Sequence, residues 1–350
     1  RQLLLQLLQQ APRGSPWIEV RGQWLGDSSL LEQVRQAYRR GLRLVWRGEL
    51  SDLPGGDIAA CFDNSLLSLS PAEAVGALQS SASTGQRGVR ASPILDGQMY
   101  ENLPTVALLS LCLDRHRAVA VAGWPSDDVL YSLRHQQLQP SHATIFKLMK
   151  AIDAEQSLDS FEHILSEDPL LAYRFLTYTN SAALGLRTGI DSLRRGLVML
   201  GYGTLQRWLG DQLPHASTDP NLSPIRQTMV LRAQLKERLV EAGIEYELRR
   251  EVYLTGLLSQ LDTLMDEPIA TILRRLPLSE RISDAIVLRS GPYAPALQIA
   301  CALETDDASV VRQLCETHEM DTESVNRALL RLLSELHVER PRPGQPTGSR

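Results

Sequence analysis

Histidine is the side chain most suited to holding a catalytic metal on a helix, but the seven histidines of this chain are poorly spaced for that task. A helical metal-dependent hydrolase of the His-Asp type needs a neutral imidazole and a carboxylate on one helical turn, with further His and Asp ligands nearby. The seven are His116, His135, His142, His163, His215, His318 and His337. No two of them are three or four residues apart, and none is followed directly by an aspartate. We therefore expect no metal, no cofactor and no catalytic residue.

Other patterns that carry catalytic chemistry lead to the same expectation. The sequence has no phosphate-binding G-x-x-x-x-G-K-[ST] loop, no H-E-x-x-H and no G-x-S-x-G. Gly201-Tyr-Gly203 could belong to a dinucleotide cradle, but it lacks a third glycine and a preceding strand, which favours a turn between helices. Asp127-Asp128 and Asp306-Asp307 could bind a metal, but adjacent side chains diverge, which favours helix caps. The sequence predicts that the protein is not an enzyme.

Composition indicates an ordinary globular protein. Hydrophobic residues make up 43% of the chain and charged residues 22%. The net charge of −5 argues against a dedicated nucleic-acid binder, which usually has a basic surface. The four cysteines are far apart and are expected to be reduced thiols. Apolar runs are much shorter than the roughly 20 residues that cross a bilayer, and no signal peptide is evident, so we expect a cytoplasmic protein.

The first 140 residues alternate short apolar runs with amphipathic segments, which predicts an α/β layer with partly parallel strands. Four or five strands are too few for a complete eight-stranded barrel. The expected strands are 17–20, 43–46, 58–62 and 118–122, and the expected helices are 28–40, 71–79 and 103–115.

After residue 140 the pattern becomes helical. Asp168-Pro169 places an N-cap oxygen before a proline at the first helical position, where the missing N–H costs nothing. Ser223-Pro224 repeats this device, and a further helix is expected over 248–265. The fold class is therefore α+β: an α/β module at 1–140, partial or degenerate and barrel-like, then an all-helical domain at 141–338. The Pro- and Gly-rich tail at 339–350 should be disordered.

Charge is also distributed unevenly between these parts. Residues 1–140 contain 13 basic and 13 acidic side chains, whereas residues 141–350 contain 23 and 28. Only three of the 36 basic residues are lysine. Arginine favours bidentate and stacked contacts, so exposed arginines are candidate partner-binding groups, although codon bias would also explain their number.

The helical part contains a pattern that resembles the HDOD domain, a signalling relative of the His-Asp phosphohydrolases. The pattern comprises Asp168-Pro169, then Asn180-Ser181-Ala182, and Gly201 at the expected end of the next helix. A later segment around Gly256 also resembles this family, and the resemblance spans 141–335. These residues are interpreted either as internal caps and turns or as contacts to a partner. In hydrolytic relatives the resemblance places the metal ligands near Ser259 and Gln260, which cannot supply an imidazole.

The front half more weakly resembles a degenerate EAL domain, a family of cyclic di-GMP phosphodiesterases on a barrel fold. The best cues are Trp17-Ile18-Glu19-Val20 and Gly41-Leu42-Arg43-Leu44-Val45. No Glu-Ala-Leu tripeptide occurs, and Trp46-Arg47-Gly48-Glu49 stands where the family places paired aspartates. An α/β module of another origin remains an alternative.

Together these features predict a bacterial signalling protein in second-messenger, motility or biofilm regulation, which binds a partner protein through apolar helix faces with arginine rims. A homodimer is a further alternative. Binding or residual hydrolysis of cyclic di-GMP is one alternative. The other is a DNA-binding regulator built around Gly201 to Trp208, although we expect no nucleic-acid partner and no membrane contact.

Overall fold

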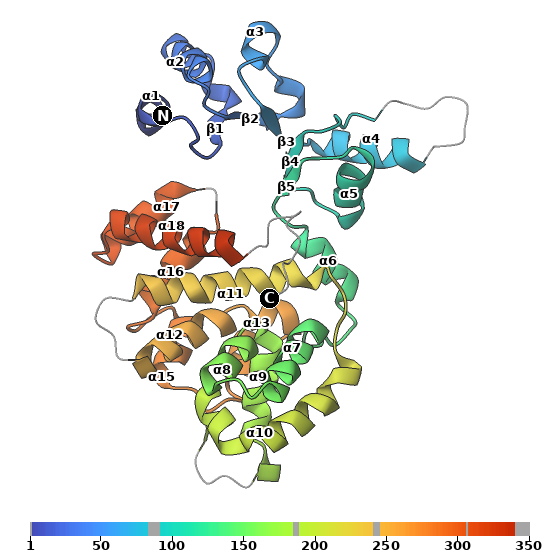
Figure 1. Cartoon of the computed structure of the whole chain (residues 1–350), viewed down its shortest axis with the longest axis vertical. Helices are drawn as coiled ribbons and strands as arrows, with labels where there is room; N and C mark the ends of the chain where they lie inside the picture. Colours follow the sequence, from blue (N-terminus) through green and yellow to red (C-terminus); the bar gives the residue numbers. More distant parts are fainter. Residues whose placement is uncertain (1, 83–91, 185–188, 241–245, 306, 340–350) are drawn as a thin grey trace, which may run out of the picture. The chain divides into compact units, whose positions relative to one another are not determined.

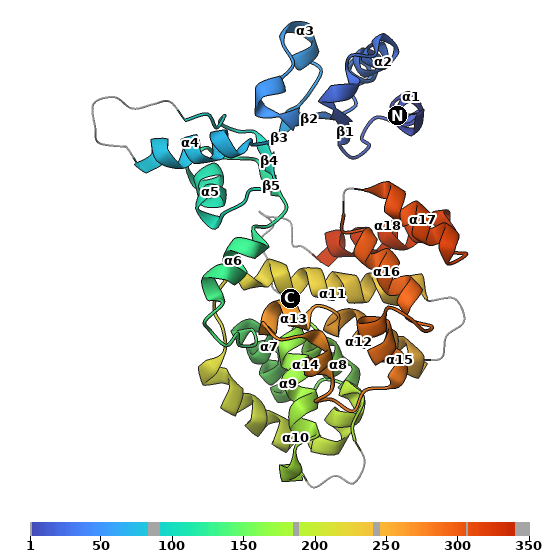
Figure 2. The same cartoon turned by 180° about the vertical axis from the view of Figure 1, so that it is seen from behind.

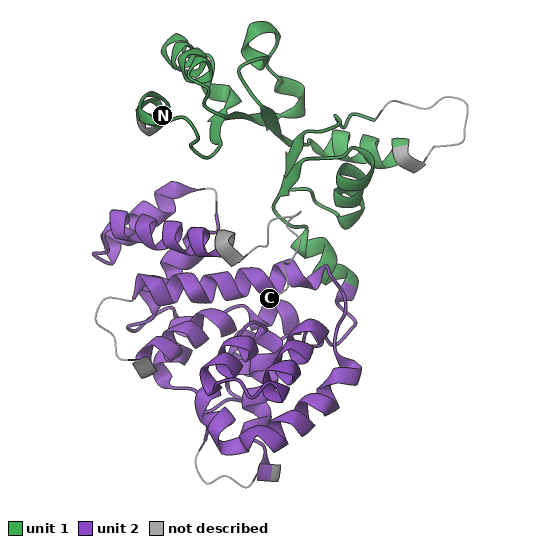
Figure 3. Ribbon diagram, viewed as in Figure 1, with its two compact units in different colours: residues 1–132 green, residues 133–350 purple. Residues whose placement is uncertain are grey.

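The computed structural model describes residues 2–82, 92–184, 189–240, 246–305 and 307–339. The chain divides into two compact units, residues 1–132 and residues 133–350 (Figure 3). The tail predicted to be disordered lies, from residue 340 on, outside the described residues.

Unit 1 is built on a parallel sheet of five strands that lie in chain order. Parallel neighbours need a crossover connection, and helices supply most of the crossovers here. The strands are β1 (Ile18–Arg21), β2 (Leu44–Glu49), β3 (Asn64–Ser68), β4 (Met99–Glu101) and β5 (Ala120–Ala122). The helices are α1 (Gln2–Gln10), α2 (Ser28–Arg39), α3 (Gly56–Ala59), α4 (Pro71–Ala82), α5 (Val106–Ser110) and α6 (Ser126–Leu133), and α5 continues into a π-helical turn at Leu111–Arg115.

The third strand differs from the sequence-based prediction. Residues 58–62 were expected to form a strand, but α3 and a turn occupy this segment, and β3 begins at Asn64 beside Val45 of β2. The apolar character of the segment has another cause, because Cys61 and Phe62 pack into the cores beside the sheet. The short strand β4 was not predicted, since three residues are too few to show a period of two.

Unit 2 is helical, as the sequence predicted (Figures 1 and 2). Its helices are α7 (His142–Asp153), α8 (Leu158–Leu165), α9 (Pro169–Thr179), α10 (Leu193–Gln212), α11 (Leu222–Leu239), α12 (Tyr246–Leu258), α13 (Leu261–Met265), α14 (Ile269–Leu273), α15 (Glu280–Ser283), α16 (Ala294–Ala302), α17 (Ala308–Thr317) and α18 (Thr322–Glu339). Helix α11 packs against α12, α16 and α18, whereas α10 packs against α7, α8 and α9. Both views show α10 at one end of the unit.

Two helix limits in unit 2 differ from the prediction. The helix expected over 248–265 is divided into α12 and α13, because the Ser259 hydroxyl donates to the carbonyl of Gly256 at 2.7 Å and Gln260 leaves the helical conformation. Helix α11 begins at Leu222, after Asn221, rather than at the predicted Ser223-Pro224 cap. None of the described helices combines the length and apolar content needed to cross a bilayer.

Candidate functional site

Asp168 is fully buried and joins three helices of unit 2. Its Oδ1 accepts hydrogen bonds from the amides of Leu170 (2.9 Å) and Leu171 (3.0 Å), which caps α9 as the sequence predicted. Its Oδ2 accepts from the amide of Ser141 at 2.6 Å, at the start of α7. The Nε of Arg226, from α11, lies 3.6 Å from the same oxygen. Asp168 therefore uses both carboxylate oxygens inside the fold, and Arg226 balances its charge.

The segment that follows α9 is held by Asn180. Its Nδ2 donates to the carbonyls of Leu176 (2.7 Å) and Ile190 (2.8 Å), and its Oδ1 accepts from the amide of Ile190 at 2.7 Å. Ser181 donates its amide to Tyr178, and Ala182 opens a short 3₁₀ turn. Pro169, the other residue of the pattern, is buried at the first position of α9. In the structure these residues cap helices and shape the turn.

Gly256 lies where α12 crosses α11. A Cβ at this position would lie 2.6 Å from the Cα of Ala233, which is closer than packed carbon atoms approach. Glycine at 256 therefore permits the close approach of the two helices.

Ser259 and Gln260 meet a guanidinium group. Arg232 of α11 donates from Nη1 to the Ser259 hydroxyl at 3.3 Å. With the amide of Gln260 turned so that its oxygen faces Arg232, that oxygen accepts from Nη2 at 2.7 Å. Arg232 also donates from Nε to Glu304 at 2.6 Å and forms a second contact with the same carboxylate. Burial acts to lower the pKa of Arg232, but the hydrogen bond and charge of Glu304 outweigh it, and the pKa is raised. Sequence reasoning singled out neither Arg232 nor Glu304.

Lys236 lies one turn after Arg232 and is fully buried. Its Nζ has no hydrogen-bond partner among the described residues and lies 5.2 Å from the centre of the Tyr293 ring. Burial lowers the pKa of this amine from 10.5 to about 6, although Cys301 acts in the opposite direction. Lys236 is therefore a neutral amine at neutral pH. The rarity of lysine in the sequence was the one signal that could have drawn attention to it.

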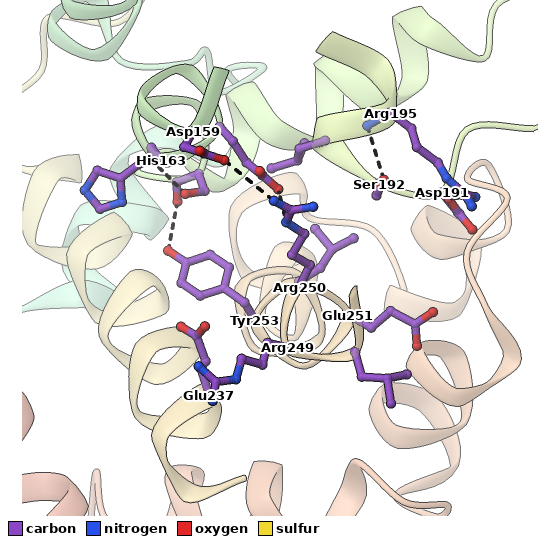
Figure 4. A pocket seen from close by; sticks show the side chains of 15 residues that line it. Asp159, His163, Asp191, Ser192, Arg195, Glu237, Arg249, Arg250, Glu251 and Tyr253 are labelled. Atoms are coloured by element: carbon purple, nitrogen blue, oxygen red, sulfur yellow. Dashed lines mark hydrogen bonds and ion pairs between the residues drawn. The ribbon is translucent and has the colours of Figure 1, made fainter. Parts of the chain in front are cut away.

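A cavity of about 320 Å³ opens between α8, the start of α10, and α11 and α12 (Figure 4). Arg250 projects across it and donates from Nε to Glu162 at 3.1 Å, while its Nη2 lies 3.8 Å from Asp159. Tyr253 donates its hydroxyl to the carbonyl of Ser166 at 3.3 Å, and burial raises the pKa of this phenol. The charged side chains around the cavity largely bind one another. They are Asp159, Glu162, Asp191, Glu237, Glu251, Arg195, Arg249 and Arg250.

An exposed apolar surface lies on α10, and we call Val198, Met199 and Tyr202 the α10 patch. Their exposed fractions are 62%, 59% and 53%. As predicted, a helical stretch ends at Gly201, which separates the two stretches of α10 with φ 66° and ψ 167°, a conformation that only glycine adopts readily. The expected turn between helices is therefore the kink at Gly201, and the second stretch of α10 follows it. The ring of Tyr202 packs edge-on against Phe161 at 5.3 Å.

In unit 1 an arginine lies between two carboxylates on the sheet. Arg47 of β2 donates from Nε to Glu101 at 3.0 Å, and its Nη1 lies 3.2 Å from Glu19 of β1. The hydrogen bond to Glu101 is the main reason that the pKa of Arg47 is raised. Sequence reasoning singled out the segments of Glu19 and Arg47 but missed Glu101, which lies at the end of the unpredicted strand β4.

Asp127, Asp128 and Asp307 lie at the starts of helices. Asp307 caps α17 by accepting from the amide of Ser309 at 2.8 Å, and the hydrogen bonds of Ser309 lower its pKa. Asp128 accepts from the amide of Val106 at 2.9 Å, and Asp306 lies outside the described residues. Within the described ranges no three His, Cys, Asp or Glu side chains gather in a geometry that could hold a metal ion.

Comparisons with known proteins identify one part of the chain. Residues 138–265 match the HDOD domain family. The chain is 24% identical over 200 residues, 57% of its length and 46% of the relative's, to the cyclic di-GMP phosphodiesterase CdgJ of Vibrio cholerae. It is 22% identical over 200 residues, 55% of its length and 47% of the relative's, to the uncharacterised protein YuxH of Bacillus subtilis. The chain thus spans about half the length of these curated relatives.

Among solved structures, the chain resembles the MmoQ response regulator of Methylococcus capsulatus strain Bath. The TM-score is 0.45 and the identity 16%, and the match covers 55% of this chain and 98% of that one.

The comparison with CdgJ corrects one prediction. The sequence was taken to indicate a protein that is not an enzyme, because it lacks His-Asp ligands. The relative from Vibrio cholerae is named a cyclic di-GMP phosphodiesterase, and this finding overturns that prediction. The missing ligands concern one chemistry in the helical part, and a chain of two units has other places for activity.

Proposed function

We propose that the chain is a bacterial signalling protein in which the region matching the HDOD domain, residues 138–265, binds a partner protein. The α10 patch carries the proposal. Val198, Met199 and Tyr202 each expose more than half of their surface, and all three lie inside the matched range. Contiguous exposed apolar side chains on a soluble domain are typical of interaction surfaces.

The polar residues of the HDOD pattern support this proposal because they form hydrogen bonds within the protein. Asp168 and Asn180 satisfy backbone groups and neighbouring side chains, and Ser259 binds Arg232. They thus organise the scaffold on which the surface of α10 is displayed.

The proposal is tested by isolating partners of the full chain. Tagged protein is expressed in its bacterium, co-purifying proteins are identified by mass spectrometry, and each candidate is purified and titrated by calorimetry. We expect one partner to bind with a Kd in the micromolar range or tighter. If no purified candidate binds the full chain at such concentrations, the proposal fails.

The name of CdgJ favours a second candidate function, which is binding or hydrolysis of cyclic di-GMP. The EAL-like origin suggested for unit 1 would locate this function there. The carboxylates of Glu19 and Glu101 are the acidic groups that approach each other on the sheet, but Arg47 already binds both, so this donor set does not fit a divalent cation. We derive no hydrolytic step from it.

The second candidate has its own test. Calorimetry with cyclic di-GMP measures binding, and chromatography after incubation with Mg²⁺ or Mn²⁺ detects the linear dinucleotide that hydrolysis would produce. Saturable binding or metal-dependent conversion supports this candidate. If neither is observed at high micromolar nucleotide, a role acting directly on this nucleotide is rejected.

A further inference from the structure

We propose that the α10 patch is the docking site for an apolar helix that carries carboxylates beside its apolar face. This inference rests on the proposed function and adds the chemistry of the partner. It follows from the geometry of the patch and from the charges on either side of it in the sequence.

The patch is open and has a defined shape. Gly201 and Gly203 lie beside it, and a Cβ built on either glycine would meet no atom within 4 Å. The bend at Gly201 and the edge-on contact of Tyr202 with Phe161 fix the direction in which the apolar side chains project. An amphipathic helix that lays its apolar face on such a surface buries side chains on both partners, which is a common mode of peptide recognition.

Two exposed arginines of α10 lie on either side of the patch in the sequence. Helix α10 contains three arginines and one aspartate, although residues 141–350 as a whole have a net charge of −5. Arg195 precedes Val198 by three residues, and its side chain is 65% exposed while it pairs with Asp191. Arg207 follows Tyr202 by five residues, is exposed, and makes no ion pair with any described residue.

Some other charged groups near α10 are already bound, whereas Asp211, which follows Arg207 by four residues, is exposed and makes no ion pair within the described residues. Arg194 pairs with Asp159 of α8, and Asp153 of α7 accepts a hydrogen bond from Gln206 at 3.2 Å. Of the three arginines of α10, Arg195 and Arg207 are the exposed ones. Carboxylates on the partner would complement them, and complementary charges at the rim of an apolar contact favour encounter and specificity.

The same charges disfavour a second copy of this chain as the occupant. A two-fold contact centred on the patch would bring the exposed arginines of two α10 helices together. Like charges would then face each other at both rims of the contact. An acidic helix from a different protein avoids this repulsion.

Two synthetic amphipathic peptides test the inference. Both are 20 residues long and have leucines at i, i+3, i+4 and i+7. One has glutamate beside the leucine face and the other has lysine. Their binding to the full chain is measured by fluorescence anisotropy. We expect the glutamate peptide to bind at least about tenfold more tightly, with an advantage that shrinks as salt is raised and screens the exposed charges.

Variants separate the apolar contribution from the charged one. Val198→Ser with Met199→Ser should weaken the glutamate peptide about tenfold or more. Arg195→Gln with Arg207→Gln should make the two peptides bind equally. Leu330→Ser removes an apolar side chain of similar exposure on α18 and should leave binding unchanged. Circular dichroism checks that each variant is folded, which we expect because all the replaced side chains are exposed.

Three results would overturn the inference. These are equal binding of the two peptides to the wild-type chain, binding that the serine variant does not weaken, and a dimer in sedimentation experiments that the serine variant dissociates. A natural partner that binds the serine variant as tightly as the wild type would reject the α10 patch but leave the proposed function intact.

Discussion

The Cα of Ala233 lies so close to Gly256 that a Cβ at position 256 would be only 2.6 Å from it. Helices α11 and α12, which lie in the range that matches the HDOD family, thus touch backbone to backbone at this point. Arg232 and Lys236 flank Ala233 on α11, so the spacing of the two helices also sets the surroundings of both buried basic side chains.

Gly256→Ala should destabilise unit 2, because the new methyl group would collide with the backbone of Ala233 and not with a flexible side chain. The two helices would have to move apart. Overpacking of this kind costs about 1–3 kcal/mol in the free energy of unfolding. Urea denaturation of wild type and variant measures the difference. Gly210→Ala, on the exposed surface of α10 with no neighbouring atom, is the control and should not destabilise. Equal stability of wild type and Gly256→Ala would show that the helices can separate at little cost.

Lys236→Met should stabilise the fold, and by an amount that depends on pH. The pKa of Lys236 is about 6 in the folded protein and 10.5 in its ordinary state, so the unfolded chain binds the additional proton between these values. The free-energy cost of burying the lysine is therefore greatest below pH 6, and it falls to zero as the pH rises toward 10.5. Between pH 6.5 and 9 the advantage of methionine should shrink by about 1.4 kcal/mol per pH unit.

Denaturant titrations at several pH values measure this advantage. Lys150→Met is the control, because this lysine is exposed and lies over the ring of Phe146. Its effect should not change over the same pH range. A constant difference between wild type and Lys236→Met would show that the amine finds a partner and stays charged.

Asp168→Ala should be among the most damaging substitutions in unit 2. It removes the cap of α9, frees the amide of Ser141 and leaves Arg226 as a buried cation without its carboxylate. Breaking a buried ion pair from one side typically costs about 3–5 kcal/mol. Asp168→Asn keeps a capping oxygen but loses the charge, so its loss should be smaller. Thermal unfolding of the three proteins gives the order, and an asparagine variant as unstable as the alanine variant would contradict the role assigned to the cap.

Gly201→Ala should strain the bend in α10. The positive φ with extended ψ is essentially restricted to glycine, and imposing it on alanine costs about 1–3 kcal/mol. We expect a lower midpoint of unfolding and altered fluorescence of Trp208, which packs against Phe175 and Tyr178. Gly203→Ala, on the same helix without a positive φ, is the matched control and should retain wild-type stability. If the two variants unfold alike, the bend is not under conformational constraint.

Much of the fold could be predicted because its signals are local. Asp168-Pro169 specified the start of α9 through the chemistry of one oxygen and one missing N–H. The strands at 18–21 and 44–49 were recognisable as apolar runs. By contrast, residues 58–62 looked like a strand because Cys61 and Phe62 are apolar, and the sequence did not distinguish a buried turn from a buried strand.

The candidate site was predicted less completely. Asn180, Ser259 and Gln260 were identified from their pattern, but their partners Ile190 and Arg232 lie 10 and 27 or more residues away and are joined to them only by packing. The burial of Lys236 had no local signal, because a lysine on an amphipathic helix ordinarily faces water.

The sequence by itself determined the helical character of the second unit, its HDOD pattern and the absence of a histidine pair suited to a metal, since each depends on neighbouring residues or on composition. Only the tertiary structure decided which charges are buried and which apolar side chains reach solvent. Val198, Met199 and Tyr202 would pass for core residues in any local pattern. They are nevertheless exposed, because burial depends on which helices a face meets, and that is a property of the whole packed chain.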